Sequence, residues 1–109
     1  MNAYQNLAAS YDRLTNDVDY KAIVDFYGEI LNREGLEPRT AVDLACGTGS
    51  VALILAQRGL LVTAVDMSGD MLCEASQKAM EAQLPIQFVC QKLQELWLPR
   101  GVDLAVCAL

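Results

Sequence analysis

The sequence predicts an α/β fold with a Rossmann-like parallel sheet and two helices ahead of it. Short apolar runs at residues 40–46, 61–65, 86–90 and 102–109 are typical of buried strands, and helical patterns at 50–58 and 68–82 separate the first three. Strands that alternate with helices form parallel sheets through right-handed crossovers. The runs lack strict apolar–polar alternation, which indicates strands covered on both faces.

The first 36 residues predict the two N-terminal helices, and residues 37–109 the sheet, together one compact unit. The first helix, at 3–14, has an apolar stripe made of Tyr4, Leu7, Ala8, Tyr11 and Leu14. The second, at 20–34, has an apolar face made of Ile23, Phe26, Tyr27, Ile30 and Leu31. Gly35 and Pro38 are expected to end it.

The later segments also carry boundary signals. Ser68 is a suitable cap for the helix at 68–82. Its inward face is expected to consist of Met71, Leu72, Ala75 and Ala79. Residues 93–98 predict a connection with a single helical turn, and Pro99 and Gly101 mark a turn before the fourth strand.

Composition narrows the function classes. The chain has 109 residues, a length that fits one domain, and a net charge of −6. It contains no histidine, which excludes catalysis or metal binding by an imidazole. The acidic balance argues against binding nucleic acid by bulk electrostatics. Neither a membrane-spanning run nor a signal peptide is visible, so we expect a cytoplasmic protein.

The four cysteines are expected to be small buried side chains in a reducing compartment. Cys46, Cys73, Cys90 and Cys107 form no C-x-x-C pair, and each lies in an apolar segment. A disulfide framework is the alternative. No metal site is predicted.

Residues 42–50, VDLACGTGS, carry the chemistry. They lie where a strand turns into a helix, and such a turn exposes backbone N–H groups and the positive end of the helix. Glycine there lets a ligand approach the backbone. Asp66 ends the next strand, where a carboxylate can accept both hydroxyls of a ribose. The segment therefore predicts a nucleoside-containing ligand.

The identity of that ligand has two readings at this point. Gly47, Gly49 and Ala52 also fit the G-x-G-x-x-A dinucleotide fingerprint, so NAD is an alternative. Asp43, at the end of the first strand, would repel a diphosphate and attract an amino group. No basic residue is expected near the turn, which also disfavours a diphosphate.

These motifs resemble the class I S-adenosylmethionine-dependent methyltransferases. DLACGTG at 43–49 is similar to that family's first motif, with Ala45 where many members have glycine, and AVDMS at 64–68 to its second. The opening YDRLTNDVDY at 11–20 is similar to the N-terminal region of small bacterial members. The resemblance implies the strand order 3-2-1-4 and S-adenosylmethionine as cofactor.

The resemblance also implies residue roles. Asp43 would interact with the methionine part, whereas capping local N–H groups is its structural alternative. Asp66 would bind the ribose hydroxyls. The base would contact Met67 and the backbone of Leu93. The cradle would be lined by Ala45, Cys46, Gly47, Thr48 and Gly49. Tyr11 and Tyr20 would close over the methionyl end, or else simply pack against the sheet.

Two departures from the family pattern stand out. Lys92 occupies the position of an acid that usually accepts a hydrogen bond from the adenine amino group, and an ammonium has no acceptor. The family sheet has seven strands, whereas this sequence contains the first four. The strand at 102–109 would therefore be an exposed edge that pairs in a homo-oligomer or with a chain that completes the sheet.

We therefore expect the cofactor-binding portion of a methyltransferase with an unidentified acceptor. No residue is identified as a general base, because Asp43 and Asp66 are expected to be binding residues. The alternatives are a non-catalytic module that binds S-adenosylmethionine, a fragment of a longer protein, and half of an NAD-dependent reductase.

Overall fold

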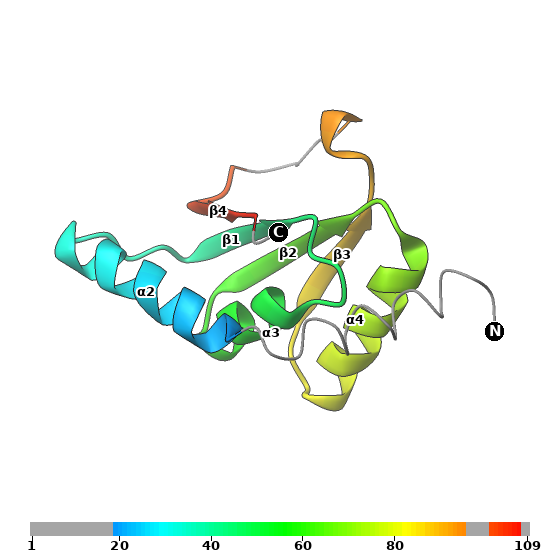
Figure 1. Ribbon diagram of the computed structural model, residues 1–109, viewed down its shortest axis with the longest axis horizontal. Helices are drawn as coiled ribbons and strands as arrows, with labels where there is room; N and C mark the ends of the chain where they lie inside the picture. Colours follow the sequence, from blue (N-terminus) through cyan, green and yellow to red (C-terminus); the bar gives the residue numbers. More distant parts are fainter. Residues whose placement is uncertain (1–18, 96–100, 108–109) are drawn as a thin grey trace.

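The computed structural model describes residues 19–95 and 101–107 and contains a four-stranded, all-parallel sheet (Figure 1). Its strands are β1 (Thr40–Leu44), β2 (Leu61–Asp66), β3 (Ile86–Cys90) and β4 (Leu104–Val106), in the order β3-β2-β1-β4. The α/β class and the order 3-2-1-4 are confirmed. The fourth strand is shorter than the predicted 102–109, of which residues 108 and 109 lie outside the described part.

In the described ranges three α-helices accompany the sheet: α2 (Tyr20–Arg33), α3 (Ser50–Gln57) and α4 (Gly69–Glu81). Asp19 caps α2 by accepting a 2.9 Å hydrogen bond from the Ala22 amide. Ser68 caps α4, as predicted, by accepting one from the Met71 amide at 3.2 Å. A single 3-10 turn, η1 (Leu93–Glu95), follows β3. The predicted helix at 3–14 lies outside the described residues.

The register of the strands shows which side chains face the helices. Two rows of paired residues cross the whole sheet; one consists of Ile86, Val62, Ala41 and Leu104, the other of Phe88, Ala64, Asp43 and Val106. Seven of these eight residues are apolar, and all seven belong to or pack on the core cluster that also contains Val24 of α2 and Leu55 of α3. Asp43 is the one carboxylate in the two rows.

The helices α2, α3 and α4 lie on the same side of the sheet (Figure 1). For α3 and α4 this follows from handedness, because the two right-handed crossovers advance in the same direction, from β1 to β2 and on to β3. The inward residues of α4 are those predicted: Met71, Leu72, Ala75 and Ala79 are buried. Among the described residues, no α-helix covers the opposite face, whereas the sequence pattern predicts cover on both.

The apolar face of α2 differs from the prediction. Phe26, Tyr27 and Ile30 are exposed, with 59% of Phe26 accessible, and Val24 is the buried residue instead. Val24 and Gly28, together with Tyr27 and Leu31 of the predicted face, line an apolar groove with α3 and β4, so the inward face is shifted toward Val24 and Gly28. The helix carries more apolar positions than one face can bury, so spacing alone does not select the face.

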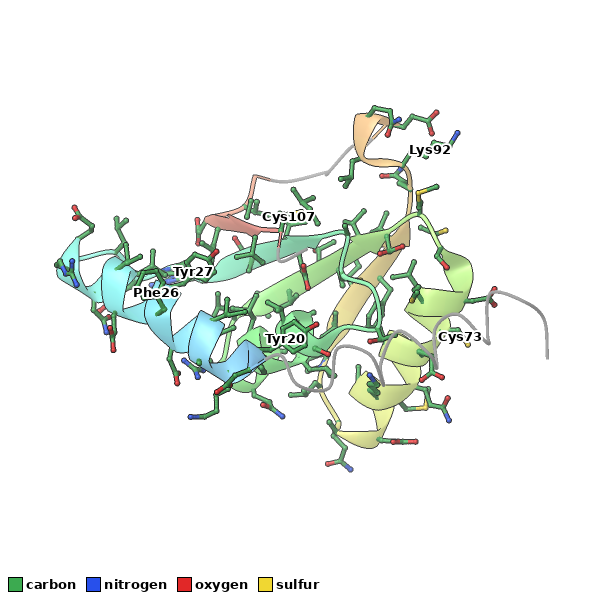
Figure 2. All side chains as sticks on the ribbon, viewed as in Figure 1. Tyr20, Phe26, Tyr27, Cys73, Lys92 and Cys107 are labelled. Carbon is green, nitrogen blue, oxygen red and sulfur yellow. The ribbon has the colours of Figure 1, made fainter. Side chains whose placement is uncertain are left out.

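The prediction of four buried cysteines is wrong for three of them. Cys46 is half-buried, whereas Cys73, Cys90 and Cys107 are exposed free thiols. Cys73 lies on the outward side of α4 (Figure 2), and Cys90 and Cys107 lie at the ends of β3 and β4. These two strands are the edges of the described sheet, where an apolar run does not guarantee burial. None of the described helices is long and apolar enough to cross a membrane.

Candidate functional site

The carboxyl ends of the strands form the candidate site. The chain leaves β1 toward β2 on one side, and β4 pairs on the other side of β1, so β1 lies at the point where the strand order reverses. Parallel α/β sheets bind ligands outside the carboxyl ends of the strands at such a point. Asp43 is near the end of β1 and Asp66 ends β2. The topology therefore brings together the two carboxylates that the sequence singles out.

The backbone between β1 and α3 forms a tight cradle. Ala45, Gly47 and Gly49 have φ angles of 58°, 57° and 88°, in the left-handed region. The Gly49 amide donates to the Cys46 carbonyl at 3.0 Å and closes a turn over 46–49. Ala45 holds a conformation that suits glycine, which accounts for glycine at this position in the resembling family. Thr48 is buried beneath the turn.

Asp66 joins this cradle to the loop after β2. One carboxylate oxygen, Oδ2, accepts the Gly47 amide at 2.8 Å, and Oδ1 accepts the Ser68 amide at 2.9 Å. The side chain is half-buried, and each carboxylate oxygen has a further lone pair for a donor from solvent or ligand. Asp66 is therefore held in place by two backbone contacts while it keeps its capacity to accept hydroxyl groups.

Asp43 is in a different state. It is 2% exposed, and its Oδ2 atom has no hydrogen-bond partner within the described protein. Burial raises the pKa of this carboxyl to about 7; the nearby Asp66 charge adds to the rise, and a backbone hydrogen bond from Ala52 opposes it. A buried carboxylate oxygen without a partner is costly in free energy unless a ligand or water supplies the missing donor.

A hollow opens beside Asp43. It is lined by Tyr20, Asp43, Ala45, Cys46, Thr48, Ser50 and Val51. Tyr20 begins α2, and in Figure 2 it lies next to the β1–α3 loop. Burial and the two carboxylates raise the pKa of the Cys46 thiol to about 12, so it stays protonated at neutral pH. The hollow thus contains one titratable carboxyl, that of Asp43, and the first residues of α3. The N-cap of α3 is Gly49, so no side chain of the cap residue accepts a hydrogen bond from the amides of the first turn.

The ends of β2 and β3 form the other side of the site. The Gln91 amide donates to the Asp66 carbonyl at 3.0 Å, and the Cys90 thiol lies 3.6 Å from the Met67 carbonyl. Met67, which follows Asp66 in the chain, is 70% exposed, and Leu93 in η1 is 46% exposed, so both offer apolar surface. Lys92 is exposed and points outward beside η1 (Figure 2). Tyr11 lies outside the described residues.

Sequence reasoning missed a basic residue at the turn. Lys78 of α4 reaches the cradle, with Nζ 3.4 Å from the Thr48 carbonyl oxygen. The statement that no basic residue stands near the turn is therefore wrong in three dimensions, because α4 packs against the loop thirty residues earlier. Lys78 lies one helical turn after the buried Ala75, a spacing that could have indicated it. No group of three or more Cys, Asp or Glu suited to a metal ion gathers in the described ranges.

The fold, with two carboxylates around a glycine turn, is a Rossmann-like domain of the class I methyltransferase type. Comparison with known proteins gives the family: the profile of the methyltransferase domain matches residues 41–109. The chain belongs to this family of S-adenosylmethionine-dependent methyltransferases. The resemblance inferred from the motifs is thereby confirmed.

Three relatives illustrate the match. A methyltransferase-family protein of Geobacillus is 39% identical over 94 residues, which cover 85% of this chain and 38% of that protein. An S-adenosylmethionine-dependent methyltransferase of Clostridium acetobutylicum superposes with a TM-score of 0.82 at 36% identity, over 97% of this chain and 44% of its own. The magnesium protoporphyrin IX methyltransferase of Synechocystis, solved with S-adenosylhomocysteine, has a TM-score of 0.66 at 30% identity, over 81% and 41%. The chain spans less than half the length of each.

Proposed function

We propose that this chain binds S-adenosylmethionine at the carboxyl ends of β1 and β2, as the cofactor-binding portion of a methyltransferase with an unidentified acceptor. One observation carries the proposal: the buried Asp43 carboxylate has an oxygen without a partner among the described residues, and Asp43 lines a hollow at the carboxyl end of the sheet. An amino group could donate to that oxygen and a ribose could donate to Asp66. Family membership supports the same ligand.

Asp43 is suited to the methionyl end of the cofactor. Its oxygen lacks a donor, and a cationic ammonium or sulfonium nearby would favour the ionised carboxylate over the protonated one. Tyr20, in the same hollow, is suited to cover the methionyl part. We propose the same role for Tyr11, which has only the sequence resemblance in its support.

The adenosine end has its own set of residues. Asp66 is suited to accept the ribose hydroxyls, since its position is fixed by the Gly47 and Ser68 amides. Met67 and Leu93 offer exposed apolar surface for the base. The backbone cradle consists of Ala45, Cys46, Gly47, Thr48 and Gly49. Lys92 provides no acceptor for an adenine amino group, so the base is held by packing and backbone contacts.

The cofactor supplies an activated methyl group, and the residues described here bind and orient it. We assign none of them as a general base, and the Cys46 thiol, with its pKa raised to about 12, is no nucleophile at neutral pH.

A calorimetric titration of the 109-residue chain with S-adenosylmethionine and, separately, with NADH tests the ligand class. We expect micromolar binding of the first and none of the second. Binding of NADH instead would favour the dinucleotide alternative, for which the proximity of Lys78 to the turn is the one supporting contact. No binding of either by a chain that is folded by circular dichroism would contradict the proposal.

We further propose that the free edge of β4 pairs with another strand, from a second copy or from a chain that completes the sheet. In the described sheet, β4 pairs with β1 on one side, and its other edge has no described partner. Sedimentation at micromolar concentration, with reductant to keep Cys107 from cross-linking, is expected to show species above 11.9 kDa. A single 11.9 kDa species would contradict self-association. A cytoplasmic location fits the four free thiols.

A further inference from the structure

Helix α4 touches the cradle at two places that neither the motif nor the family match assigns. Ala75 packs under Gly49: a β-carbon built on Gly49 would lie 2.9 Å from the Ala75 β-carbon. Three residues later, the Lys78 ammonium lies 3.4 Å from the Thr48 carbonyl oxygen. These contacts come from one face of one helix and meet two consecutive residues of the turn.

The Lys78 contact acts on the peptide that closes the turn. The Thr48 carbonyl and the Gly49 amide belong to the same peptide group, and that amide donates to the Cys46 carbonyl at 3.0 Å. A cationic donor on the carbonyl polarises the peptide and makes its N–H a stronger donor, since linked hydrogen bonds reinforce one another. Lys78 therefore strengthens the bond that closes the 46–49 turn.

The 46–49 turn also orients the Gly47 amide that donates to Asp66. Gly47 lies inside it, and its N–H donates to Asp66 Oδ2 at 2.8 Å. Any loosening of the turn moves this amide and releases one of the two contacts that hold the carboxylate. The buried Ala75 leaves Gly49 no space to move toward α4. Packing against Ala75 and the hydrogen bond from Lys78 therefore both hold the turn in place.

We infer that Lys78 is a positioning residue that sets the affinity for the nucleoside ligand by holding the 46–49 turn through the Thr48 carbonyl. The inference rests on the proposed function for its ligand. It assigns Lys78 no contact with that ligand.

Two readouts test this inference, with S-adenosylhomocysteine as the probe. Calorimetry is expected to give a dissociation constant about threefold to tenfold higher for Lys78→Met, because the loosened turn weakens the contact of the Gly47 amide with Asp66. The Gly49 amide proton of the ligand-free, 15N-glycine-labelled protein is expected to move upfield because its bond to Cys46 weakens. Lys78→Arg should restore both, since a guanidinium keeps the charge and the donor. Lys78→Gln, shorter and neutral, serves if the Met variant unfolds.

Lys21→Met is the matched control, because Lys21 is an exposed α2 lysine that pairs with Asp25 away from the cradle. It should change neither readout. An unchanged dissociation constant in Lys78→Met would overturn the inference, and so would weaker binding with an unmoved Gly49 amide. If the wild-type chain binds no S-adenosylhomocysteine, the proposed function and the affinity claim fail together. The amide shift then shows separately whether Lys78 holds the turn.

Discussion

The two ends of the sheet use aspartate in opposite ways. At the amino end, the exposed Asp103 accepts the Arg39 and Thr40 amides at 2.8 and 3.2 Å through Oδ2, while its own amide donates to the Thr40 hydroxyl at 2.9 Å. Backbone hydrogen bonds hold its pKa below the ordinary value. At the carboxyl end, Asp43 is buried and has a raised pKa, and one of its oxygens has no partner among residues 19–95 and 101–107.

The difference separates stability from function. Asp103 links β1 to the segment before β4, and each polar atom of the contact has a hydrogen-bond partner. Because Asp103 is exposed, the free-energy cost of desolvating its carboxylate is small. Asp43 lowers the stability of the folded chain because its ionised form is buried. Packing alone would favour an eighth apolar side chain in the helix-facing rows, so the destabilising carboxylate at Asp43 supports the proposed role in ligand binding.

The largest effect is expected for Asp43 as pH changes. Its pKa of about 7 lies above the ordinary value of 3.8, so the folded state retains a proton that the unfolded state has lost between these values. Stability therefore falls as pH rises from about 4 to 7, by up to about 4 kcal/mol, and the loss is complete above pH 7. Denaturant unfolding of wild type and Asp43→Asn across this window measures it.

Asp43→Asn should remove this pH dependence and exceed wild type in stability at pH 8. The affinity for S-adenosylmethionine should show the opposite trend in wild type, rising with pH as the carboxylate ionises, and should be weak and flat in Asp43→Asn. An affinity that is independent of pH in both proteins would contradict a contact between Asp43 and the ligand.

The next largest effect on stability is expected from substitutions of two glycines, Gly49 in the cradle and Gly28 in α2. Gly49→Ala should destabilise the fold by about 1–3 kcal/mol, because φ is 88° and the new β-carbon meets Ala75 at 2.9 Å. Gly28→Ala, in open space within α2, should stabilise it by about 0.5–1 kcal/mol. Thermal unfolding of both variants measures the contrast. Equal shifts of the same sign would mean that the cradle geometry is not as described.

Adding Ala75→Gly to Gly49→Ala sharpens this comparison. The smaller residue on α4 gives the new methyl group space, while the backbone strain at φ 88° remains. Because a glycine inside α4 costs stability by itself, Ala75→Gly is also measured alone, and the double variant should be more stable than the sum of the two single changes predicts. Strict additivity would imply that backbone strain alone is responsible.

The smallest effect is expected for Asp103→Ala. Thermal unfolding should show a modest loss of stability at neutral pH, because the Arg39 and Thr40 amides lose their acceptor. Its pKa is lowered in the folded state, so its contribution is present above pH 4 and disappears as pH falls further, opposite in sign to that of Asp43. An identical pH dependence in wild type and variant would contradict this assignment.

Much of the fold could be predicted from the sequence. Strand and helix periods, the Ser68 cap and the spacing of the glycine turn to Asp66 depend on residues close in sequence. The exposure of Phe26 and Ile30 on α2, and of Cys90 and Cys107 at the sheet edges, could not be predicted, because it depends on which neighbours cover a surface.

The candidate site also contains residues that could be predicted from local sequence and residues that could not. Local patterning indicated Asp43 and Asp66 because Asp43 lies near the end of one strand and Asp66 ends the next. Lys78 escaped it because its contact with Thr48 spans two elements. The unpartnered state of the Asp43 oxygen is likewise a property of the packed fold, since the same carboxylate could have been satisfied by one more backbone amide.

The most direct test of the account is a calorimetric titration of S-adenosylmethionine into Asp66→Ala and Asp103→Ala beside the wild-type chain. Both variants remove an aspartate that accepts two backbone amides, at opposite ends of the sheet. We predict that Asp66→Ala weakens binding about tenfold to a hundredfold, from the loss of a charged acceptor, whereas Asp103→Ala binds as wild type does. Equal affinities in the two variants would contradict a cofactor site at the carboxyl end.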